Sequence, residues 1–376
     1  MNKSRGKYFI VMVLAVSVAV ILMGYVKAEA QWEAEWQKTL AAGKKEGEVA
    51  VYVSSLGTTV RKQAPVFQEK FGIKVDAIVG RGNELRQKLN REKTAGLNLA
   101  DVVISGGNSL IGFKKMGITE PMDNKLILPE VIDPKLWITL DRLPWFDDAK
   151  HSFYFYAYPS RDITINTDLV KPGEIQSWQD LLRPQYKGKI VWNDPSIAGS
   201  GFESFAGNLI NKVTDENYYR QLVATQNVAL SRNERQLAEW LAKGKYAVAV
   251  SLGGPPVAQM LKVGAHIAPV IVKEGAYLNY SGGIVGIAAK SPHPNAAKVY
   301  VNWLLSKEGQ DFIQRTTGYM SARTDIPTEG IVSPANMRIP GEKYFVSASS
   351  TDIWLTGGQK KYLALAKDIF GPLIGR

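Results

Sequence analysis

The sequence of 376 residues contains no cysteine. Without a thiol, the chain has no disulfide, thiolate metal site, iron–sulfur cluster or cysteine nucleophile. A bacterial lipid anchor is excluded as well, because it needs a cysteine directly after the signal segment. We therefore expect the fold to be stable through its apolar core alone.

Catalytic motifs are scarce. The chain has three His, and none stands at a motif spacing from Ser54 or Ser55, so no nucleophile with a base is indicated. There is no His-Glu-x-x-His and no phosphate-binding Lys loop, and Gly80-Arg81-Gly82 lacks the third glycine of a nucleotide fingerprint. The sequence argues against an enzyme and predicts neither a cofactor nor a metal site.

Long apolar runs are limited to one, from about Phe9 to Val26. It follows three basic residues and precedes Ala28-Glu29-Ala30, which predicts a secretory signal over residues 1–30, cut after Ala30. Because the run approaches membrane-spanning length, an uncleaved N-terminal anchor is the alternative. Either way we expect the bulk of the protein in the periplasm, and a multi-span membrane protein is excluded.

Basic residues outnumber acidic ones, and the formal net charge is +11. The first thirty residues contribute +3, which leaves +8 for the predicted mature part. This charge favours an anionic ligand, or equally an anionic cell envelope. No run of Lys and Arg exceeds two residues, so we expect no nucleic-acid partner.

The length exceeds what one simple core holds, so two lobes are expected. In the first lobe, short apolar strands alternate with amphipathic helices, which predicts an α/β fold with a largely parallel sheet. The predicted elements are strands at 49–53, 73–79 and 101–104 and helices at 58–71 and 83–95.

A strand at 163–166 is predicted to cross into a second lobe. That lobe has predicted strands at 189–192, 246–251 and 267–272 and helices at 202–209, 217–224 and 233–243. A return strand at 283–288 and helices at 296–305 and 359–370 follow. We expect four parts: signal peptide 1–30; lobe 1 at 31–160 plus 285–330; lobe 2 at 161–284; and a C-terminal helical segment, 331–376, packing on a lobe.

Four stretches together resemble a known family. The chain resembles the extracellular solute-binding proteins of ABC transporters, of the ferric-iron-transporter type. The resemblance is carried by Glu84-Leu85-Arg86 through Ala100-Asp101-Val102-Val103, by Thr164 to Val170 with Trp178-Gln179-Asp180-Leu181, by Lys187 to Ile190 with Asp194-Pro195 and Gly199-Ser200-Gly201, and by Pro292 to Lys307. It implies a two-lobed periplasmic-binding-protein type II fold, in which each lobe is a mostly parallel sheet flanked by helices and crossing hinge strands join the lobes.

The iron chemistry of that family does not carry over. Its iron-binding members use a His after the first strand, a Glu after the third and a Tyr pair in the second lobe. Here those places resemble Ser54-Ser55, Gly107-Asn108 and the segment 251–256, which offer no anionic oxygen suited to ferric iron. Tyr218-Tyr219 lies in a predicted helix and is assigned to packing. We expect no iron site.

Ligands of such lobes bind beyond the carboxyl ends of the parallel strands. A helix start near Gly201 would offer free N–H groups to an anion. The alternative for each glycine and serine is that it only forms a turn. The candidates are Ser54, Ser55, Ser105, Gly107 and Asn108 in lobe 1, and Asn193, Asp194, Ser200, Gly201, Gly254 and Tyr280 from lobe 2 and the return crossing.

Arg161 stands at the predicted crossing between the lobes. Its guanidinium could form a fork with a carboxylate or phosphonate. The alternative is a salt bridge to Asp162 or Asp168. Trp192 is either core or a wall of the pocket.

These features predict the periplasmic substrate-binding component of an ABC import system. It would capture a small polar, anionic solute between two lobes by hinged closure and present it to a permease. We expect a monomer. The alternatives are an extracytoplasmic sensor module and, less favoured, a periplasmic enzyme of similar fold.

Overall fold

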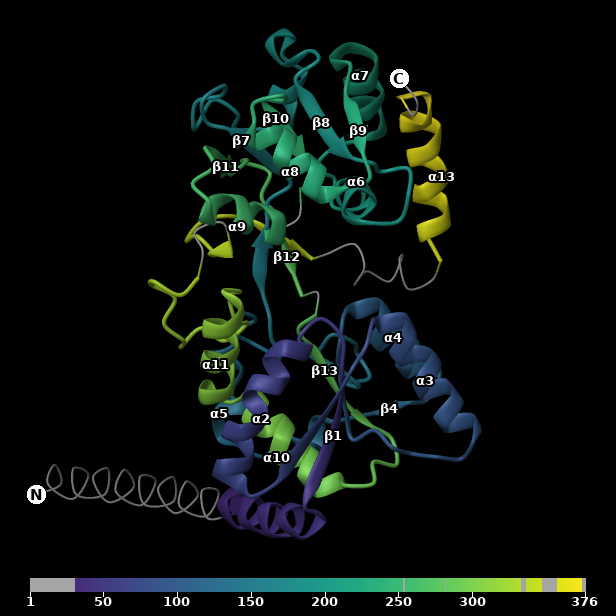
Figure 1. Cartoon of the computed structure of the whole chain (residues 1–376), viewed down its shortest axis with the longest axis vertical. Helices are drawn as coiled ribbons and strands as arrows, with labels where there is room; N and C mark the ends of the chain where they lie inside the picture. Colours follow the sequence, from purple (N-terminus) through teal and green to yellow (C-terminus); the bar gives the residue numbers. More distant parts are fainter. Residues whose placement is uncertain (1–30, 253, 281, 333–335, 347–356, 374–376) are drawn as a thin grey trace, which may run out of the picture.

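A computed structural model of the chain describes residues 31–252, 254–280, 282–332, 336–346 and 357–373. Figure 1 shows two lobes stacked along the long axis, with α13 (Gln359–Phe370) beside the upper one. The predicted signal and its cleavage point after Ala30 lie outside the described residues. Within these ranges, no helix has the length and apolar character needed to span a membrane.

The first lobe is built on a six-stranded sheet with the order β2-β1-β3-β13-β4, and β5 also pairs with β13. Strands β2, β1 and β3 are parallel, as predicted, but β13 runs antiparallel to β3, β4 and β5. The sheet is mixed because β13 returns from the second lobe and enters from the opposite end. The bounds are β1 Glu48–Val53, β2 Lys74–Val79, β3 Val102–Ser105, β4 Thr119–Glu120, β5 Phe153–Tyr154 and β13 Ile284–Ala288.

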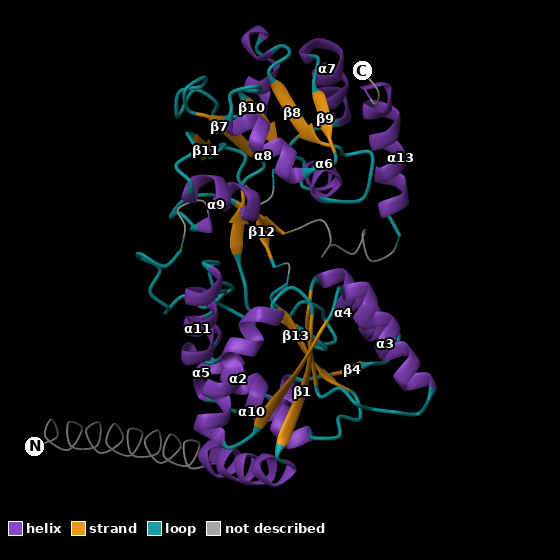
Figure 2. Ribbon diagram, viewed as in Figure 1, coloured by secondary structure: helices purple, strands orange, loops and turns teal. Residues whose placement is uncertain are grey.

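Helices cover both faces of this sheet (Figure 2). Residues 31–46 are helical, and Gly72 ends α2 with a left-handed φ of 69°, as its position predicted. Phe67 of α2 packs in the core against Tyr300 and Trp303. The helices are α2 Gly57–Phe71, α3 Gly82–Thr94, α4 Gly107–Lys115, α5 Pro129–Ile132, α10 Pro294–Leu305 and α11 Lys307–Thr317, with 3-10 turns η1 Asp123–Lys125 and η2 Pro134–Leu136.

The second lobe has a five-stranded sheet with the order β11-β7-β10-β8-β9. Strands β10, β8 and β9 are parallel, whereas β7 is antiparallel to β10 and β11. The strands are β7 Ile163–Asn166, β8 Ile190–Asn193, β9 Ala229–Ser231, β10 Val248–Val250 and β11 Ile267–Pro269. The helices are α6 Ser200–Ile210, α7 Glu216–Gln226, α8 Glu234–Ala242 and α9 Gly254–Lys262, with 3-10 turns η3 Trp178–Leu182, η4 Pro184–Tyr186 and η7 Gly371–Leu373.

The core of the second lobe is aromatic. Trp192 is fully buried and packs against Trp178, Tyr219 and Phe370. Trp192 therefore belongs to the core and does not form a pocket wall. Tyr218 and Tyr219 lie in α7, as predicted, and pack into the same core. Because Phe370 belongs to α13, the C-terminal helix packs on this lobe.

A small third sheet lies where the chain passes between the lobes (Figure 2). It contains β6 (Tyr158–Ser160), β12 (Ala276–Asn279) and β14 (Tyr344–Val346). Strand β12 pairs antiparallel with β6 and parallel with β14. The outward crossing, the return crossing and the C-terminal segment are thus hydrogen-bonded together at the hinge.

Candidate functional site

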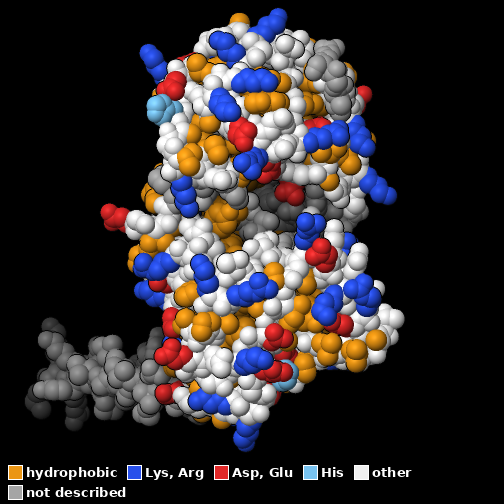
Figure 3. All heavy atoms as spheres, in the orientation of Figure 1, with side chains coloured by type: hydrophobic (Ala, Val, Ile, Leu, Met, Phe, Trp, Pro, Cys, Tyr) orange, Lys and Arg blue, Asp and Glu red, His pale blue; other side chains and the backbone are white. Residues whose placement is uncertain are grey.

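The carboxyl ends of the parallel strands from both lobes are directed at the same space. Strands β1, β2 and β3 end there from lobe 1, and β8, β9 and β10 end there from lobe 2. Figure 3 shows that the surface is hollowed between the two lobes. This position is where open α/β sheets place ligands.

Lobe 1 forms a pocket of about 630 Å³ at this edge. Three of the predicted residues, Ser54, Ser55 and Ser105, line it, and the hydroxyls of Ser54 and Ser105 are 2.8 Å apart. Arg81 and Ser109 also line the pocket. Neither residue was predicted from the sequence. Arg81 could have been, because it follows the predicted strand 73–79, and positions after strands selected the other candidates.

Helix starts surround the same pocket. Neither α2, which follows Leu56, nor α4, which follows Gly106, has a side-chain hydrogen bond at its N-cap. Gly82 begins α3 so close to α4 that an added Cβ would lie 2.5 Å from the Ser109 hydroxyl. The pocket therefore combines hydroxyls, backbone N–H groups and the Arg81 guanidinium, which donate hydrogen bonds to an anion, with the carboxylate of Glu84, whose Oε2 accepts from the Arg81 N–H at 2.9 Å.

Two of the residues predicted to contact the solute in lobe 1 lie outside this pocket. Gly107 and Asn108 do not form a loop over the solute, because they open the first turn of α4 and are not among the pocket-lining residues. A Cβ on Gly107 would lie 2.7 Å from the Phe146 ring, so the glycine permits packing there. The Asn108 side chain is exposed.

In lobe 2, the predicted Asn193 and Ser200 come together with a third residue, Glu234. The Ser200 hydroxyl donates to Glu234 Oε1 at 2.5 Å, and Asn193 Nδ2 donates to the same oxygen at 3.2 Å and to Ser200 Oγ at 2.7 Å. Gly201 is adjacent, and a Cβ there would lie 1.9 Å from the Asn193 carbonyl oxygen. Gly201 is thus required by the close approach of α6 to β8.

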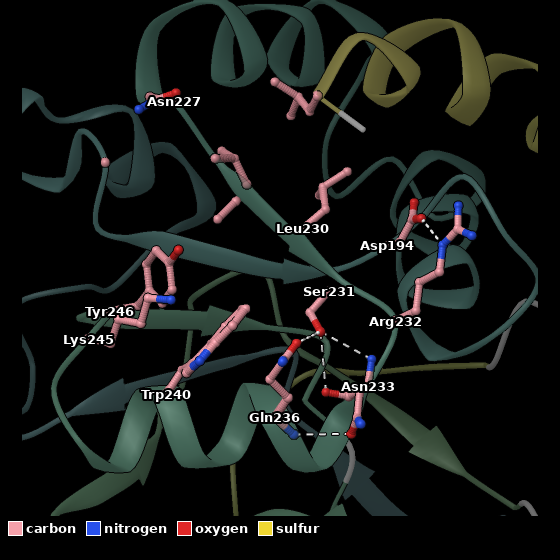
Figure 4. Close-up of a pocket in the computed structure, with 14 residues that line it drawn as sticks. Asp194, Asn227, Leu230, Ser231, Arg232, Asn233, Gln236, Trp240, Lys245 and Tyr246 are labelled. Carbon is pink, nitrogen blue, oxygen red and sulfur yellow. Dashed lines mark hydrogen bonds and ion pairs between the residues drawn. The ribbon is translucent and has the colours of Figure 1, made fainter. Parts of the chain in front are cut away.

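Asp194 is buried and hydrogen-bonded within the protein. It accepts from the backbone N–H of Ser196 at 2.9 Å and from its hydroxyl at 2.6 Å, and it pairs with Arg232 Nε at 2.9 Å. Figure 4 shows this pair at one end of a second pocket, of about 710 Å³, that follows the edge strand β9. At the opposite end, Lys245 Nζ lies 3.9 Å from the centre of the Trp240 ring.

Arg161 binds a carboxylate of the chain itself, and its contact with a solute stays a prediction. Both Nε and Nη2 bind Glu342, at 3.0 and 2.5 Å, and Nη2 also donates to the Met337 carbonyl at 3.1 Å. Both side chains are 3% exposed. The guanidinium fork is filled by the chain's own carboxylate from the C-terminal segment. Asp168, one of the two partners proposed from the sequence, instead binds His266 at 2.9 Å.

Tyr280 does not line the pocket either. Its ring packs against Tyr154 with centroids 4.3 Å apart, and burial raises the pKa of both hydroxyls. The nearby Gly282 approaches lobe 1, where an added Cβ would lie 2.7 Å from Ser55. Gly254 begins α9, shortly after β10.

Carboxyl groups near the hinge were not foreseen from the sequence. Asp162 follows β6 and accepts from the Ser204 hydroxyl at 2.7 Å, while its carbonyl accepts from the Ser251 N–H at 2.7 Å. Burial raises the pKa of Asp162 to about 7. Burial also raises the pKa of Glu203, which precedes Ser204 in α6. Among the described residues, no group of three His, Asp or Glu side chains is placed to hold a metal ion.

The sequence profile described as "Bacterial extracellular solute-binding protein" matches residues 50–311. "Iron uptake protein A1" of Synechocystis sp. is 24% identical over 282 residues, which are 71% of this chain and 73% of that protein. The "Spermidine/putrescine-binding periplasmic protein" of Escherichia coli is 24% identical over 261 residues, which are 67% of this chain and 71% of that protein.

Solved structures show the same fold. Ferric iron-binding protein A of Mannheimia haemolytica, in an open conformation, is similar with a TM-score of 0.66 at 17% identity, covering 86% of this chain and 98% of that one. The expected type II periplasmic-binding-protein fold is confirmed. Likeness at this identity establishes the architecture and leaves the chemistry of the site to its own residues.

Proposed function

The chain belongs to the bacterial extracellular solute-binding proteins, and we propose that it is the substrate-binding component of an ABC import system. In this proposal it acts in the periplasm as a monomer, binds a small polar solute between its lobes and presents the closed form to a permease. Binding, rather than catalysis, is the role that its relatives' names describe.

The observation that carries the proposal is the lobe 1 pocket. Hydroxyls of Ser54, Ser55 and Ser105 line it beside the starts of α2, α3 and α4. Arg81 adds a positive charge and Glu84 a carboxylate. A carboxylate or phosphonate group would find several hydrogen-bond donors within one small volume. We therefore place the anionic group of the solute in lobe 1.

We do not extend the iron chemistry of some relatives to this chain. Ferric iron needs anionic oxygen ligands, and the corresponding strand end in lobe 1 carries the neutral hydroxyls of Ser54 and Ser55. Tyr218 is engaged elsewhere, because its hydroxyl donates to the Trp178 carbonyl at 2.8 Å inside lobe 2. A tyrosinate-to-iron absorption band on titration with ferric citrate would contradict this part of the proposal.

Closure would bring the two strand edges onto one solute. The hinge sheet of β6, β12 and β14 joins the lobes through short strands, and we place the pivot of the rotation there. A solute that touches both edges stabilises the closed form relative to the open one.

A thermal-shift screen of the mature protein tests the function. The panel contains carboxylates, phosphonates, phosphate esters, amino acids and polyamines. A solute at a hundred times its dissociation constant adds about 2.7 kcal/mol to the free energy of unfolding. We expect a marked rise in melting temperature for at least one compound with an anionic group. A folded protein that no compound of the panel stabilises would contradict the proposed function.

A further inference from the structure

Lobe 2 carries three carboxyl groups near its strand edge that lack a basic partner. Asp162, Glu203 and Glu234 form no ion pair with a Lys, Arg or His among the described residues, although the chain has a net charge of +11. Asp194, in contrast, is paired with Arg232. A half-buried carboxylate without a counter-charge is unfavourable unless a cation reaches it.

The Glu234 carboxylate is oriented by hydrogen bonds to only one of its two oxygens. Ser200 and Asn193 both donate to its Oε1, which fixes the carboxylate at the start of α8. Its Oε2 accepts no hydrogen bond from the described residues, and the side chain is half-buried. One carboxylate oxygen is therefore oriented by the protein while the other remains available.

Asp162 repeats this arrangement. Ser204 donates to its Oδ2, and its Oδ1 accepts nothing from the described part of the chain. The raised pKa values of Asp162 and Glu203 have burial as their first cause and no cation that lowers them. A positive charge on a solute that reached these groups would favour their ionised forms and lower both pKa values.

Ser251 is hydrogen-bonded to the backbone of Asp162 and to Asn193, and it supplies an independent observation. Its N–H donates to the Asp162 carbonyl, and its carbonyl accepts from Asn193, the residue that also binds Glu234. Ser251 has a left-handed φ of 57° and is 4% exposed. Its buried hydroxyl has no hydrogen-bond partner among the described residues. A strained residue with an unsatisfied hydroxyl at a strand end indicates a group that arrives from outside.

We propose that the solute carries an ammonium group, which binds lobe 2 between Asp162 and Glu234, while its anionic group binds lobe 1. The solute would then be zwitterionic. This inference rests on the proposed function and names the class of its solute. In Figure 3, acidic colour is visible deep in the hollow below the upper lobe, and a basic side chain lies on the lower rim.

An ammonium group fits this edge better than a metal ion does. It has three N–H donors and no acceptor, which matches carboxylate and hydroxyl oxygens that are spread over several elements. A metal ion would instead need its oxygens converged on one point at about 2–2.6 Å. The three carboxyl groups come from the hinge, α6 and α8, and do not form such a group.

Calorimetry with matched probes tests the inference. The probes are amino acids and aminophosphonates of two to four carbons, each beside its analogue without the amine, together with 1,3-diaminopropane and magnesium chloride. We expect at least one zwitterion to bind, and its analogue without the amine to bind at least tenfold more weakly. Equal or tighter binding of that analogue, or binding of the diamine or the metal ion instead, overturns the inference.

Two variants locate the ammonium group. Glu234→Gln keeps the shape and the Ser200 contact but removes the charge, so it should weaken the zwitterion roughly ten- to a hundredfold. The same variant should leave the analogue without the amine unchanged or bind it more tightly. Glu239→Gln is the control, because Glu239 lies on the same helix and pairs with Arg235 at 3.2 Å. Equal effects of the two variants on the zwitterion would overturn the inference.

The outcomes also separate this inference from the function on which it rests. Binding of a simple anion without preference for an amine leaves the solute-binding function in place and rejects the ammonium site. A folded protein that binds none of the probes, and no compound of the thermal-shift panel, rejects both. Asp162→Asn gives a second measure of the site, should Glu234→Gln lower the melting temperature.

Discussion

In both lobes the carboxyl ends of parallel strands face the hollow, but the two sets of strand ends carry different side chains. In lobe 1 these ends carry serine hydroxyls, helix starts without side-chain caps and the exposed Arg81. In lobe 2 they carry Asn193, Ser200 and Glu234, which already bind one another. The first edge is rich in donors, although the Glu84 carboxylate also lines it, and the second is rich in acceptors.

This difference shows that architecture places a site and side chains determine its chemistry. A fold shared with iron-binding and polyamine-binding relatives is compatible with either kind of solute. Here the opposite polarity of the two edges favours a solute that has opposite charges at its two ends.

The largest effect is expected for Arg161→Ala, and on stability. The substitution leaves Glu342 buried without its partner, which should lower the free energy of unfolding by about 3–5 kcal/mol. Urea denaturation at pH 7 measures this change. The double variant Arg161→Met/Glu342→Leu should recover most of the loss, since it removes both charges. A stable Arg161→Ala protein that fails to bind an anionic solute would return Arg161 to the site.

Gly201→Ala should be the next most damaging change. The new methyl group would lie 1.9 Å from the Asn193 carbonyl, so α6 must move away from β8, at a cost of about 3 kcal/mol. This disturbs the Asn193–Ser200–Glu234 contacts and leaves the lobe 1 edge unchanged. Gly199→Ala is the matched control, because no atom lies within 4 Å of its Cβ position. Similar melting temperatures for the two variants would show that the lobe 2 edge is loosely packed.

Arg81→Ala tests the donor character of lobe 1. Because Arg81 is exposed, loss of its charge should weaken binding of an anionic group about tenfold, or about 1.4 kcal/mol, without lowering the melting temperature. Lys243→Ala is a control with the same charge change on an exposed residue that ends α8. Calorimetry on both proteins measures the effect, and equal affinities would place the anion elsewhere.

Local sequence signals predicted most of the fold. Gly72 ends α2 and the apolar strands β1, β2 and β3 lie within one residue of their predicted starts. α4 is not predicted, because Gly106 and Gly107 suggest a loop, whereas they begin a helix that packs against Phe146. The strands of the hinge sheet are only three or four residues long, so their pairing rather than their sequence defines them.

The site was less accessible to sequence reasoning. Strand-end rules placed Ser54, Ser55, Ser105, Asn193 and Ser200 at the two strand edges, and their contact with a solute stays a prediction. The rules gave no sign of Glu342, which binds Arg161 from 181 residues away in the C-terminal segment. A charged residue in a loop is equally suited to a solute and to a distant carboxylate until the tertiary structure chooses between them.

The smallest expected effect is on the pH dependence of the free energy of unfolding, which depends on Asp162 in lobe 2. Burial raises the pKa of Asp162 from 3.8 to about 7, so the unfolded chain loses this proton at lower pH than the folded protein does. The wild type should therefore lose stability as pH rises from about 4 to 7, on the order of 1 kcal/mol after partial solvation. The titratable groups that interact with Asp162 are Tyr219 and Tyr277, whose raised pKa values keep them neutral. Glu203, which precedes the Ser204 that binds Asp162, also has a raised pKa.

Asp162→Asn should reduce the slope of the free energy of unfolding against pH. The control Asp168→Asn should retain that slope, because Asp168 is exposed. Unfolding free energies at pH 4.5, 6 and 8 measure the difference. A saturating zwitterion should also reduce the wild-type slope, because its ammonium group favours the ionised carboxylate and lowers the pKa of Asp162 in the complex. A simple anion bound only in lobe 1 has no such contact and should leave the slope unchanged. Identical slopes for wild type and Asp162→Asn would mean that Asp162 is not the carboxyl group that accepts the ammonium group in lobe 2.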